Sequence, residues 1–283
     1  MELTLPNYTF VPSLERATID DYVSLFRDSF SGDGKLNADY LRWEYLANPH
    51  GQVIGVDAFL GDNLVAHYAI IPRRYRLGTQ IFDAALSVNT ATHPLHQGKG
   101  LFTKLAEITY QLAAQRGVKF VVGAANANSV GGFTRKLGFT VLGQIRLYVG
   151  FKAVAATTEY LDLDIQPDWL EWRLANPSRR YERVTHCDGS TTLRTHVKGL
   201  PFNIARVITT NLVDSQPATS LSLNRALIPA LAPVFAATKP TGFQLPLWVQ
   251  PSPWHVIWRL LDPSISPSLS VRLRLDGLSM DTF

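Results

Sequence analysis

Two glycines on either side of a lysine form the part of this chain whose residue types and spacing best suit chemistry. Gly98, Lys99 and Gly100 come after a β-rich run and before a helix-patterned segment. Because glycine lacks a Cβ atom, the backbone here can curl closely round a phosphate, with successive N–H groups pointing outward at the helix N-terminus. The sequence therefore predicts a phosphate-bearing cofactor near residues 97–102, where Lys99 either contacts the phosphate or lies exposed.

Hydrophobic periodicity and turn residues predict the elements that must position this loop. Before the loop, strands are expected over residues 53–60, 64–77 and 80–92, joined by turns at residues 61–63 and 78–79. After the loop we expect a helix over 101–115 ended by Gly117, a strand over 119–125, a helix over 129–137 and closing strands over 139–152. The loop then lies where a strand passes into a helix.

A sequence echo divides the chain into two halves. Residues 39–49 read DYLRWEYLANP, and residues 168–177 read DWLEWRLANP, one residue shorter. An aligned aromatic, Leu, Trp and Leu-Ala-Asn-Pro block is improbable by chance, so the echo predicts a tandem duplication. We therefore expect two domains, residues 1–152 and 153–283, each with a helix that Asn-Pro ends.

The second half repeats the layout without the loop. Strands are expected over residues 180–187, 191–197, 202–213 and 242–249, with a helix within residues 220–237 and a last element over 254–261. Residues 209–216, at the place of the phosphate loop, contain no glycine. The second domain is therefore not expected to hold a cofactor, and we interpret it as a shell that shapes or closes the site.

Composition bounds the class of protein. Hydrophobic residues make up 46% of the 283 residues and charged residues 18%, which allows a packed core. The single cysteine, Cys187, excludes an internal disulfide and favours a reducing compartment. The net charge of +4 is spread without long basic blocks, which suits a small anionic ligand better than a nucleic acid.

Targeting and metal-binding patterns are absent from the sequence. No apolar run approaches the ~20 residues of a membrane span, and residues 1–10 lack a signal-peptide pattern. The histidines are scattered and the cysteine stands alone, so no metal-ligand spacing is found. We expect a cytoplasmic protein with small-molecule substrates, no metal, no nucleic-acid partner and no membrane span; its oligomeric state is not indicated.

The glycine loop and a later segment together resemble a known family. Gln97-Gly98-Lys99-Gly100-Leu101-Phe102 is similar to the Gln/Arg-x-x-Gly-x-Gly/Ala signature of the GNAT superfamily of acyl-CoA-dependent N-acyltransferases, and it departs from that signature at Phe102. Residues 126–129 (NANS) and 133–139 (FTRKLGF) resemble the family's second motif, an Asn-led turn with a Lys-x-Gly-Phe ending. The resemblance covers about residues 15–150. The second half resembles a degenerate GNAT module in layout only.

This resemblance implies a fold and a co-substrate. The fold would be α/β (α+β), with tandem GNAT-like modules that each have a mixed, mostly antiparallel central sheet flanked by helices. The co-substrate would be acetyl-CoA or a longer acyl-CoA, with its pyrophosphate on the backbone of the glycine loop and its pantetheine between splayed strands. The residues that the resemblance assigns to acyl-CoA are Thr90, Ala91, Thr92, Gln97, Gly98, Lys99, Gly100, Leu101, Phe102, Asn126, Ser129 and Phe133.

Both customary acid–base groups of the family are missing. Leu86 stands where a glutamate often serves as base, and Thr134 stands where a tyrosine often protonates the thiolate. His67 is a substitute by geometry, because a two-residue turn at residues 78–79 would pair it with Thr90 on the cleft side of the sheet. Histidine ordinarily titrates near neutral pH, which suits a general base. The alternatives are a hydrogen-bonded core histidine and an acceptor amine that loses its proton to water.

Four further residues are candidates, and most have a structural alternative. His93 is a second candidate catalytic residue, or a cap for the turn that follows it. Tyr40 and Trp43 are candidates to line an acceptor pocket, but their repetition in the echo favours aromatic packing of the helix. Asn89 is a further candidate for the acceptor site.

The chain as a whole looks like the tandem-GNAT group often associated with N-acylation of amino sugars for bacterial surface polysaccharides such as lipopolysaccharide. We therefore expect an acyl-CoA-dependent N-acyltransferase whose small acceptor is a nucleotide-linked amino sugar. The alternatives are a lysine or peptide N-acetyltransferase, a tRNA-dependent aminoacyl ligase, and a non-catalytic acyl-CoA-binding module. The missing acid–base groups are the reason that the binding module stays among the alternatives.

Overall fold

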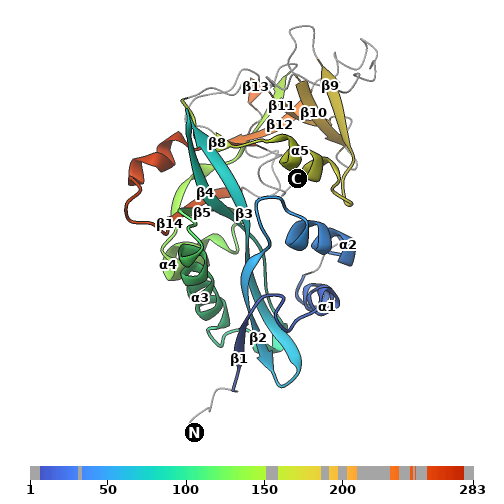
Figure 1. The fold of residues 1–283 in the computed structure, drawn as a ribbon, viewed down its shortest axis with the longest axis vertical. Coiled ribbons are helices and arrows are strands. Elements are labelled where there is room, and N and C mark those ends of the chain that lie inside the picture. The colour runs from blue at the N-terminus through green and yellow to red at the C-terminus, as the bar shows by residue number, and fades with distance from the viewer. Residues whose placement is uncertain are drawn as a thin grey trace.

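A computed structural model describes residues 7–30, 34–150, 159–185, 191–196, 203–208, 230–235, 243–244, 246 and 254–276 of the chain. It contains a long sheet with helices on both faces and a second sheet, which lies at the top of Figure 1. Cys187 and most of the expected helix over 220–237 lie outside the described residues.

The first sheet is mixed and mostly antiparallel. Its strands are β1 (Thr9–Pro12), β2 (Ile54–Leu60), β3 (Asn63–Leu77), β4 (Gln80–Thr92), β5 (Phe120–Ala125), β6 (Thr140–Gln144), β8 (Asp162–Leu163) and β14 (His255–Leu260). Their order is β1-β2-β3-β4-β5-β14-β6, with β8 paired to β3. The neighbours run antiparallel except β4 and β5, which are parallel. The expected fold class, a mostly antiparallel sheet flanked by helices, is confirmed.

The long hairpin of β3 and β4 forms the centre of this sheet. A two-residue turn pairs Leu77 with Gln80, as predicted, and Gly78 takes the left-handed conformation that such a turn needs (φ 59°). Side chains of β3 alternate between two cores: Ala69 lies in one and Tyr68 in the other. Whether a side chain of β3 or β4 can reach the site therefore depends on the face of the sheet to which it points.

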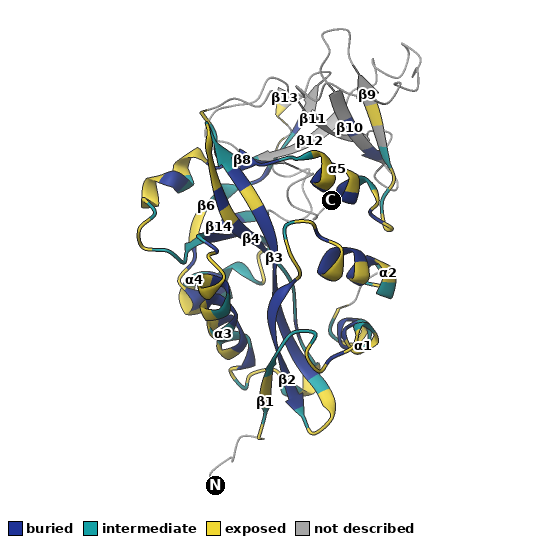
Figure 2. Ribbon diagram, viewed as in Figure 1, coloured by how far each residue is buried: buried dark blue, intermediate teal, exposed yellow. Residues whose placement is uncertain are grey.

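Helices cover both faces of the first sheet (Figure 1). On one side lie α1 (Ile19–Ser29), α2 (Ala38–Leu41) and the π-helical turn Arg42–Leu46 that continues α2. On the other side lie α3 (Leu101–Gln115) and α4 (Val130–Leu137). Their sheet-facing sides are buried and their outer sides exposed (Figure 2). Among the described residues, no helix is long and apolar enough to cross a membrane.

The second sheet is built mainly from the second half of the chain. Its order is β13-β7-β12-β11-β10-β9, with β15 paired to β12. The strands are β7 (Arg146–Gly150), β9 (Tyr181–Thr185), β10 (Thr191–His196), β11 (Asn203–Ile208), β12 (Ala230–Phe235), β13 (Phe243–Gln244) and β15 (Leu275–Asp276), and the helix α5 (Pro167–Leu174) precedes β9. The predicted helix within residues 220–237 is wrong at 230–235, because pairing of β12 with β7 and β11 overrides the helix preference of its alanines.

The two halves exchange strands. β14, from the second half, lies in the first sheet between β5 and β6, whereas β7, from the first half, lies in the second sheet between β12 and β13. The expectation that residues 139–152 close the first sheet is therefore correct for β6 and wrong for β7. A division at residue 152 does not follow the sheets, since the first sheet contains β8 and β14 from the second half and the second sheet contains β7 from the first.

The two echoed segments pack against each other. The rings of Trp43 and Trp172 stack with centroids 4.4 Å apart and planes 8° apart. Each ring nitrogen donates to the backbone carbonyl of the other tryptophan, at 2.7 Å from Trp43 and 2.9 Å from Trp172. The equivalent residues thus exchange the same contacts, as two residues related by a local two-fold axis would.

Candidate active site

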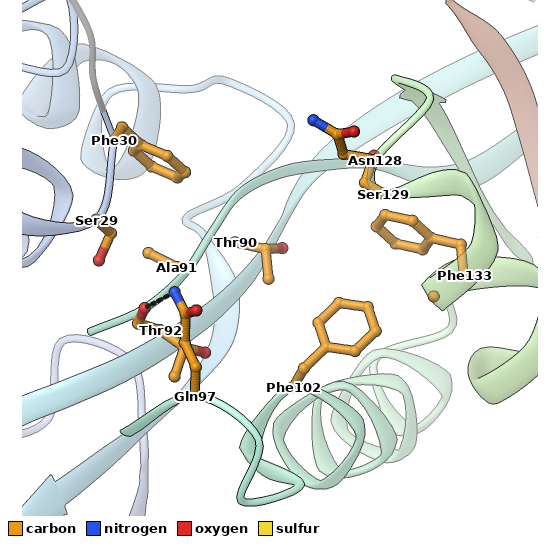
Figure 3. A pocket seen from close by; sticks show the side chains of 11 residues that line it. Ser29, Phe30, Thr90, Ala91, Thr92, Gln97, Phe102, Asn128, Ser129 and Phe133 are labelled. Atoms are coloured by element: carbon orange, nitrogen blue, oxygen red, sulfur yellow. Dashed lines mark hydrogen bonds between the residues drawn. The ribbon is translucent and has the colours of Figure 1, made fainter. Parts of the chain in front are cut away.

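A cleft of about 360 Å³ opens between α1, the end of β4, the glycine loop and the start of α4. In Figure 3, Ser29 and Phe30 at the end of α1 lie across the cleft from the residues of the turn before α4, and Gln97 and Phe102 lie below. Phe102 and Phe133 meet edge to face, with ring centroids 5.5 Å apart. The lining residues are Ser29, Phe30, Thr90, Ala91, Thr92, Gln97, Phe102, Asn128, Ser129, Gly132 and Phe133.

The glycine loop has the geometry of an anion site. Gly98 and Gly100 take left-handed conformations (φ 74° and 77°), and a Cβ atom on either would meet nothing within 4 Å. Helix α3 begins directly after Gly100, so the unpaired N–H groups of its first turn face the loop. Gln97 ties the loop to the end of β4, because its side-chain amide donates to the Thr92 carbonyl at 3.2 Å.

The cleft begins where β4 and β5 stop pairing. The two strands pair only from Ala84 to Ser87 on β4. Beyond this point β4 stays bound to β3, and the backbone N–H of His93 donates to the Val65 carbonyl at 2.9 Å. The side of β4 facing β5 is therefore left open to a ligand over residues 90–92.

Asn126 shapes the turn on the far side of the cleft. Its side-chain oxygen accepts hydrogen bonds from the backbone N–H groups of Asn128 and Ser129, both at 3.0 Å, and from the Ser129 hydroxyl at 3.1 Å. This arrangement holds Ser129 at the start of α4, where it lines the cleft with Phe133. Asn126 itself is not a lining residue.

Comparison with known proteins decides the family of this part of the chain. Residues 11–142 match the family model of the acetyltransferase (GNAT) domain. These residues form a GNAT acetyltransferase domain. GNAT domains are those of N-acetyltransferases and use acyl-CoA as co-substrate, so the resemblance noted at the glycine loop is confirmed for this part of the chain.

Solved structures agree on the fold of the GNAT domain and of the chain around it. A GCN5-related N-acetyltransferase from Kribbella flavida is 15% identical with a TM-score of 0.59, over 90% of this chain and 71% of that one. A GCN5-related N-acetyltransferase from Anabaena variabilis ATCC 29413 is 12% identical with a TM-score of 0.55, over 90% of this chain and 73% of that one. At these identities the likeness is one of fold. No curated protein matches the chain.

Most residues assigned to acyl-CoA lie at the cleft of the GNAT domain or beside it. Lys99, Gly100 and Leu101 line a neighbouring hollow of about 400 Å³, on the other side of the glycine loop. Gly98 lies between the two groups, in the loop itself. The assigned residues that line the cleft are Thr90, Ala91, Thr92, Gln97, Phe102, Ser129 and Phe133.

His67 lies on the expected face of the sheet but is fully buried. It pairs with Ala91 rather than with the predicted Thr90, because a bulge between His67 and Ala69 shifts the register by one residue. Its Nδ1 lies 2.6 Å from a carboxylate oxygen of Asp57, and its Nε2 lies 2.9 Å from the hydroxyl of Tyr45. Both ring nitrogens are engaged, which is the arrangement of a hydrogen-bonded core histidine.

His93 caps the turn after β4. Its Nδ1 accepts a hydrogen bond from the backbone N–H of Leu95 at 3.3 Å, at the start of the 3₁₀ turn Pro94–His96. Thr134 turns away in a similar manner, since its hydroxyl donates to the Val130 carbonyl one helical turn back at 3.0 Å. Neither side chain lines the cleft.

The three acceptor candidates lie behind the cleft wall. Tyr40 and Trp43 are buried, and neither lines the cleft. Asn89 is partly buried and donates to a carboxylate oxygen of Glu44 at 2.6 Å. Tyr40 and Trp43 both pack in the hydrophobic core, which is the structural role that their repetition in the echo favoured.

The sequence reasoning missed Glu44 and the end of α1. Glu44 is 1% exposed and accepts hydrogen bonds from Tyr40 at 3.1 Å and from Asn89. Burial raises the pKa of its carboxyl group, and the positive charge of Arg73 opposes that shift. A charged residue between Trp43 and Tyr45 in the echoed block was a signal that could have found Glu44. No comparable signal marks Ser29 or Phe30.

Proposed function

We propose that the chain is an acyl-CoA-dependent N-acyltransferase and that the cleft beside the glycine loop is its donor site. The observation that carries the proposal is that two features suited to acyl-CoA lie next to each other, along one path that the ligand could follow. The left-handed glycine loop at the start of α3 suits a pyrophosphate, and the unpaired side of β4 over residues 90–92 suits a pantetheine arm that continues from it.

The lining of this cleft favours a direct transfer with little acid–base help. In the reaction the neutral acceptor nitrogen attacks the thioester carbonyl, a C–N bond forms, and the C–S bond breaks with its electron pair leaving on sulfur. The proton that the nitrogen then sheds balances, through water, the proton that the thiolate takes up. All lining residues are described, and none carries a titratable side chain. We infer that the acceptor amine loses its proton to water before attack, so the enzyme contributes mainly by orienting the two substrates.

For the acceptor we propose the amine of a small molecule, a nucleotide-linked amino sugar. The support is the resemblance of the two-part chain to the tandem-GNAT group that acylates amino sugars, together with the mild positive net charge of +4, which suits an anionic nucleotide. A peptide lysine is the competing acceptor.

We further propose that the second half is a degenerate copy of the first. The reciprocal contacts of Trp43 and Trp172 support this proposal. So do the two echoed asparagines, which are both buried and both accept from the backbone N–H two residues on: Asn48 from His50 at 3.1 Å, and Asn176 from Ser178 at 2.8 Å.

The test is release of free thiol from acetyl-CoA and longer acyl-CoAs against a panel of amines. The panel holds dTDP- and UDP-linked amino sugars, the same sugars without nucleotide, and lysine peptides. Release that depends on a nucleotide-linked amino sugar supports the proposal, and release with peptides alone moves the acceptor to lysine.

A non-catalytic acyl-CoA-binding module is the second candidate, and the untitratable lining of the cleft is the observation that favours it. Calorimetry with CoA and acetyl-CoA separates the two candidates. Tight binding without thiol release on any amine of the panel supports the binding module, whereas turnover rejects it.

A further inference from the structure

A bulge in β4 marks the place where the cleft opens. Ala69 pairs with Val88 and His67 pairs with Ala91, so Tyr68 alone faces the two residues Asn89 and Thr90. Asn89 takes a left-handed conformation with φ 48°, which is uncommon for a residue other than glycine. A strained backbone of this kind persists only where its surroundings hold it.

Glu44 holds this bulge from the side of α2. One carboxylate oxygen accepts from the Asn89 amide at 2.6 Å, and the other accepts from the Tyr40 hydroxyl at 3.1 Å. Glu44 is almost fully buried in the π-helical turn, so water does not compete for these bonds. π-Helical turns are frequent at functional sites, and this one turns the carboxylate of Glu44 toward β4.

A second carboxylate, Asp57, lies at the end of a neighbouring chain of hydrogen bonds that starts at Tyr45, the residue after Glu44. Tyr45 lies 2.9 Å from Nε2 of His67, and Nδ1 of His67 lies 2.6 Å from Asp57. The Asp57 carboxylate also accepts from the hydroxyl of Tyr22 at 2.7 Å.

The donor and acceptor roles in this chain of hydrogen bonds can be assigned at His67. Because the Asp57 carboxylate can only accept, Nδ1 of His67 donates to it, while Nε2 lies against the Tyr45 hydroxyl. The Asn89 amide itself is held by the carboxylate of Glu44.

We propose that Glu44 is a positioning residue for acyl transfer: by holding Asn89 it fixes the β4 bulge, and with it the backbone of Thr90 and Ala91 against which the thioester lies. This inference rests on the proposed function, since it needs an acyl thioester in the cleft. Glu44 does not line the cleft and acts through Asn89, whose backbone continues into the lining residues.

The test compares Glu44→Gln with wild type in binding to acetyl-CoA and to CoA, measured by calorimetry. The phosphate loop that holds the common part of both ligands does not touch Glu44. We expect Glu44→Gln to weaken acetyl-CoA about fivefold and CoA less than about twofold, and to lower kcat about tenfold. Asp39→Asn, an exposed carboxylate in the same helix, is the control and should change none of these values.

A double-mutant cycle separates positioning from general support of the fold. Asn89→Gly keeps a left-handed bulge possible but removes the amide on which Glu44 acts. In that background Glu44→Gln should have no further effect on kcat or on the ratio of the two dissociation constants. Circular dichroism and the thermal midpoint of each variant show that it is folded.

The outcomes are distinguishable. Equal losses for acetyl-CoA and CoA, an unchanged kcat, or additive effects in the cycle overturn the positioning role and leave the proposed function standing. A folded wild type that binds neither ligand overturns the proposed function, and the inference falls with it.

Discussion

At the scale of single residues, the proposed transfer leaves removal of the proton to the acceptor amine and water. Since no titratable side chain lines it, we expect kcat/KM to rise with pH up to the pKa of the acceptor amine itself. The check is to measure kcat/KM against pH with two acceptors whose amines differ in pKa. The pH range over which kcat/KM rises should shift with the pKa of the acceptor amine. A limb that stays in place for both acceptors would instead reveal an ionising group of the enzyme.

His67 is expected to stabilise the fold without serving as a base. His67→Asn breaks the contact with buried Asp57 and should lower the free energy of unfolding by about 1.5–3 kcal/mol, the range for a hydrogen bond to a charged group. Urea denaturation measures this loss. His96→Asn, at a partly exposed histidine that shares a hydrogen bond with Tyr8, should cost less, at most about 1 kcal/mol. If His67→Asn were as stable as wild type and lost the rising limb of the pH profile, His67 would be the base after all.

Glu44 couples stability to pH with a definite sign. Burial raises its pKa above the unfolded value, while the charges of Arg73 and Lys35 and hydrogen bonds from Asn89 and Tyr40 oppose the shift. A raised carboxyl pKa means that the folded state binds the proton more tightly, so stability present at low pH is lost as pH rises through the folded pKa. Glu44→Gln should therefore lose less stability than wild type between pH 4.5 and pH 7. Denaturant titration of both proteins across this range measures the difference; parallel curves would contradict it.

At the scale of elements, the proposed phosphate site requires the glycine loop to keep its left-handed backbone. In Gly100→Ala the new Cβ has room, but φ 77° is strained for alanine, at a cost of about 1–2 kcal/mol. We expect the loop to relax and the dissociation constant of acyl-CoA to rise about tenfold. Gly61→Ala is the matched control, because Gly61 also has φ 60° with open space around it but lies in the β2–β3 turn. It should lose similar stability and keep its affinity.

Local elements could be predicted from the sequence, and the register at the site could not. The glycine turn at Gly78 and the apolar pattern of α3 carry their own signals, so β3, β4 and α3 were placed within about a residue. The bulge has no such signal, because an asparagine in a strand pattern does not by itself predict the positive φ of Asn89. The bulge shifts the register by one residue, so His67 pairs with Ala91 and not with Thr90. The glycine loop beside the cleft could be found from the spacing of its glycines. Glu44 meets Asn89 only through tertiary packing, and its one signal in the sequence was a charge inside the echoed aromatic block.

At the scale of the whole molecule, the two tryptophans join the halves into one unit. Trp43→Ala and Trp172→Ala should each lower the free energy of unfolding by about 3–5 kcal/mol, as other buried large-to-small changes do. Since each ring packs on the other, the double variant should lose about 0.5–3 kcal/mol less than the sum of the single losses. Urea denaturation of the four proteins gives this coupling. Strict additivity would show that the stacking contributes nothing beyond burial.

The exchange of β7 and β14 could not have been predicted, because either apolar run suits an interior position in either sheet. It has a consequence for how the protein is made. On the ribosome, β5 is synthesised well before β14, and its free edge stays without its partner strand until residues 255–260 have emerged. An unpaired edge of that kind can join another nascent chain. Translation speed and chaperone supply during the last part of synthesis should therefore govern the yield of folded protein.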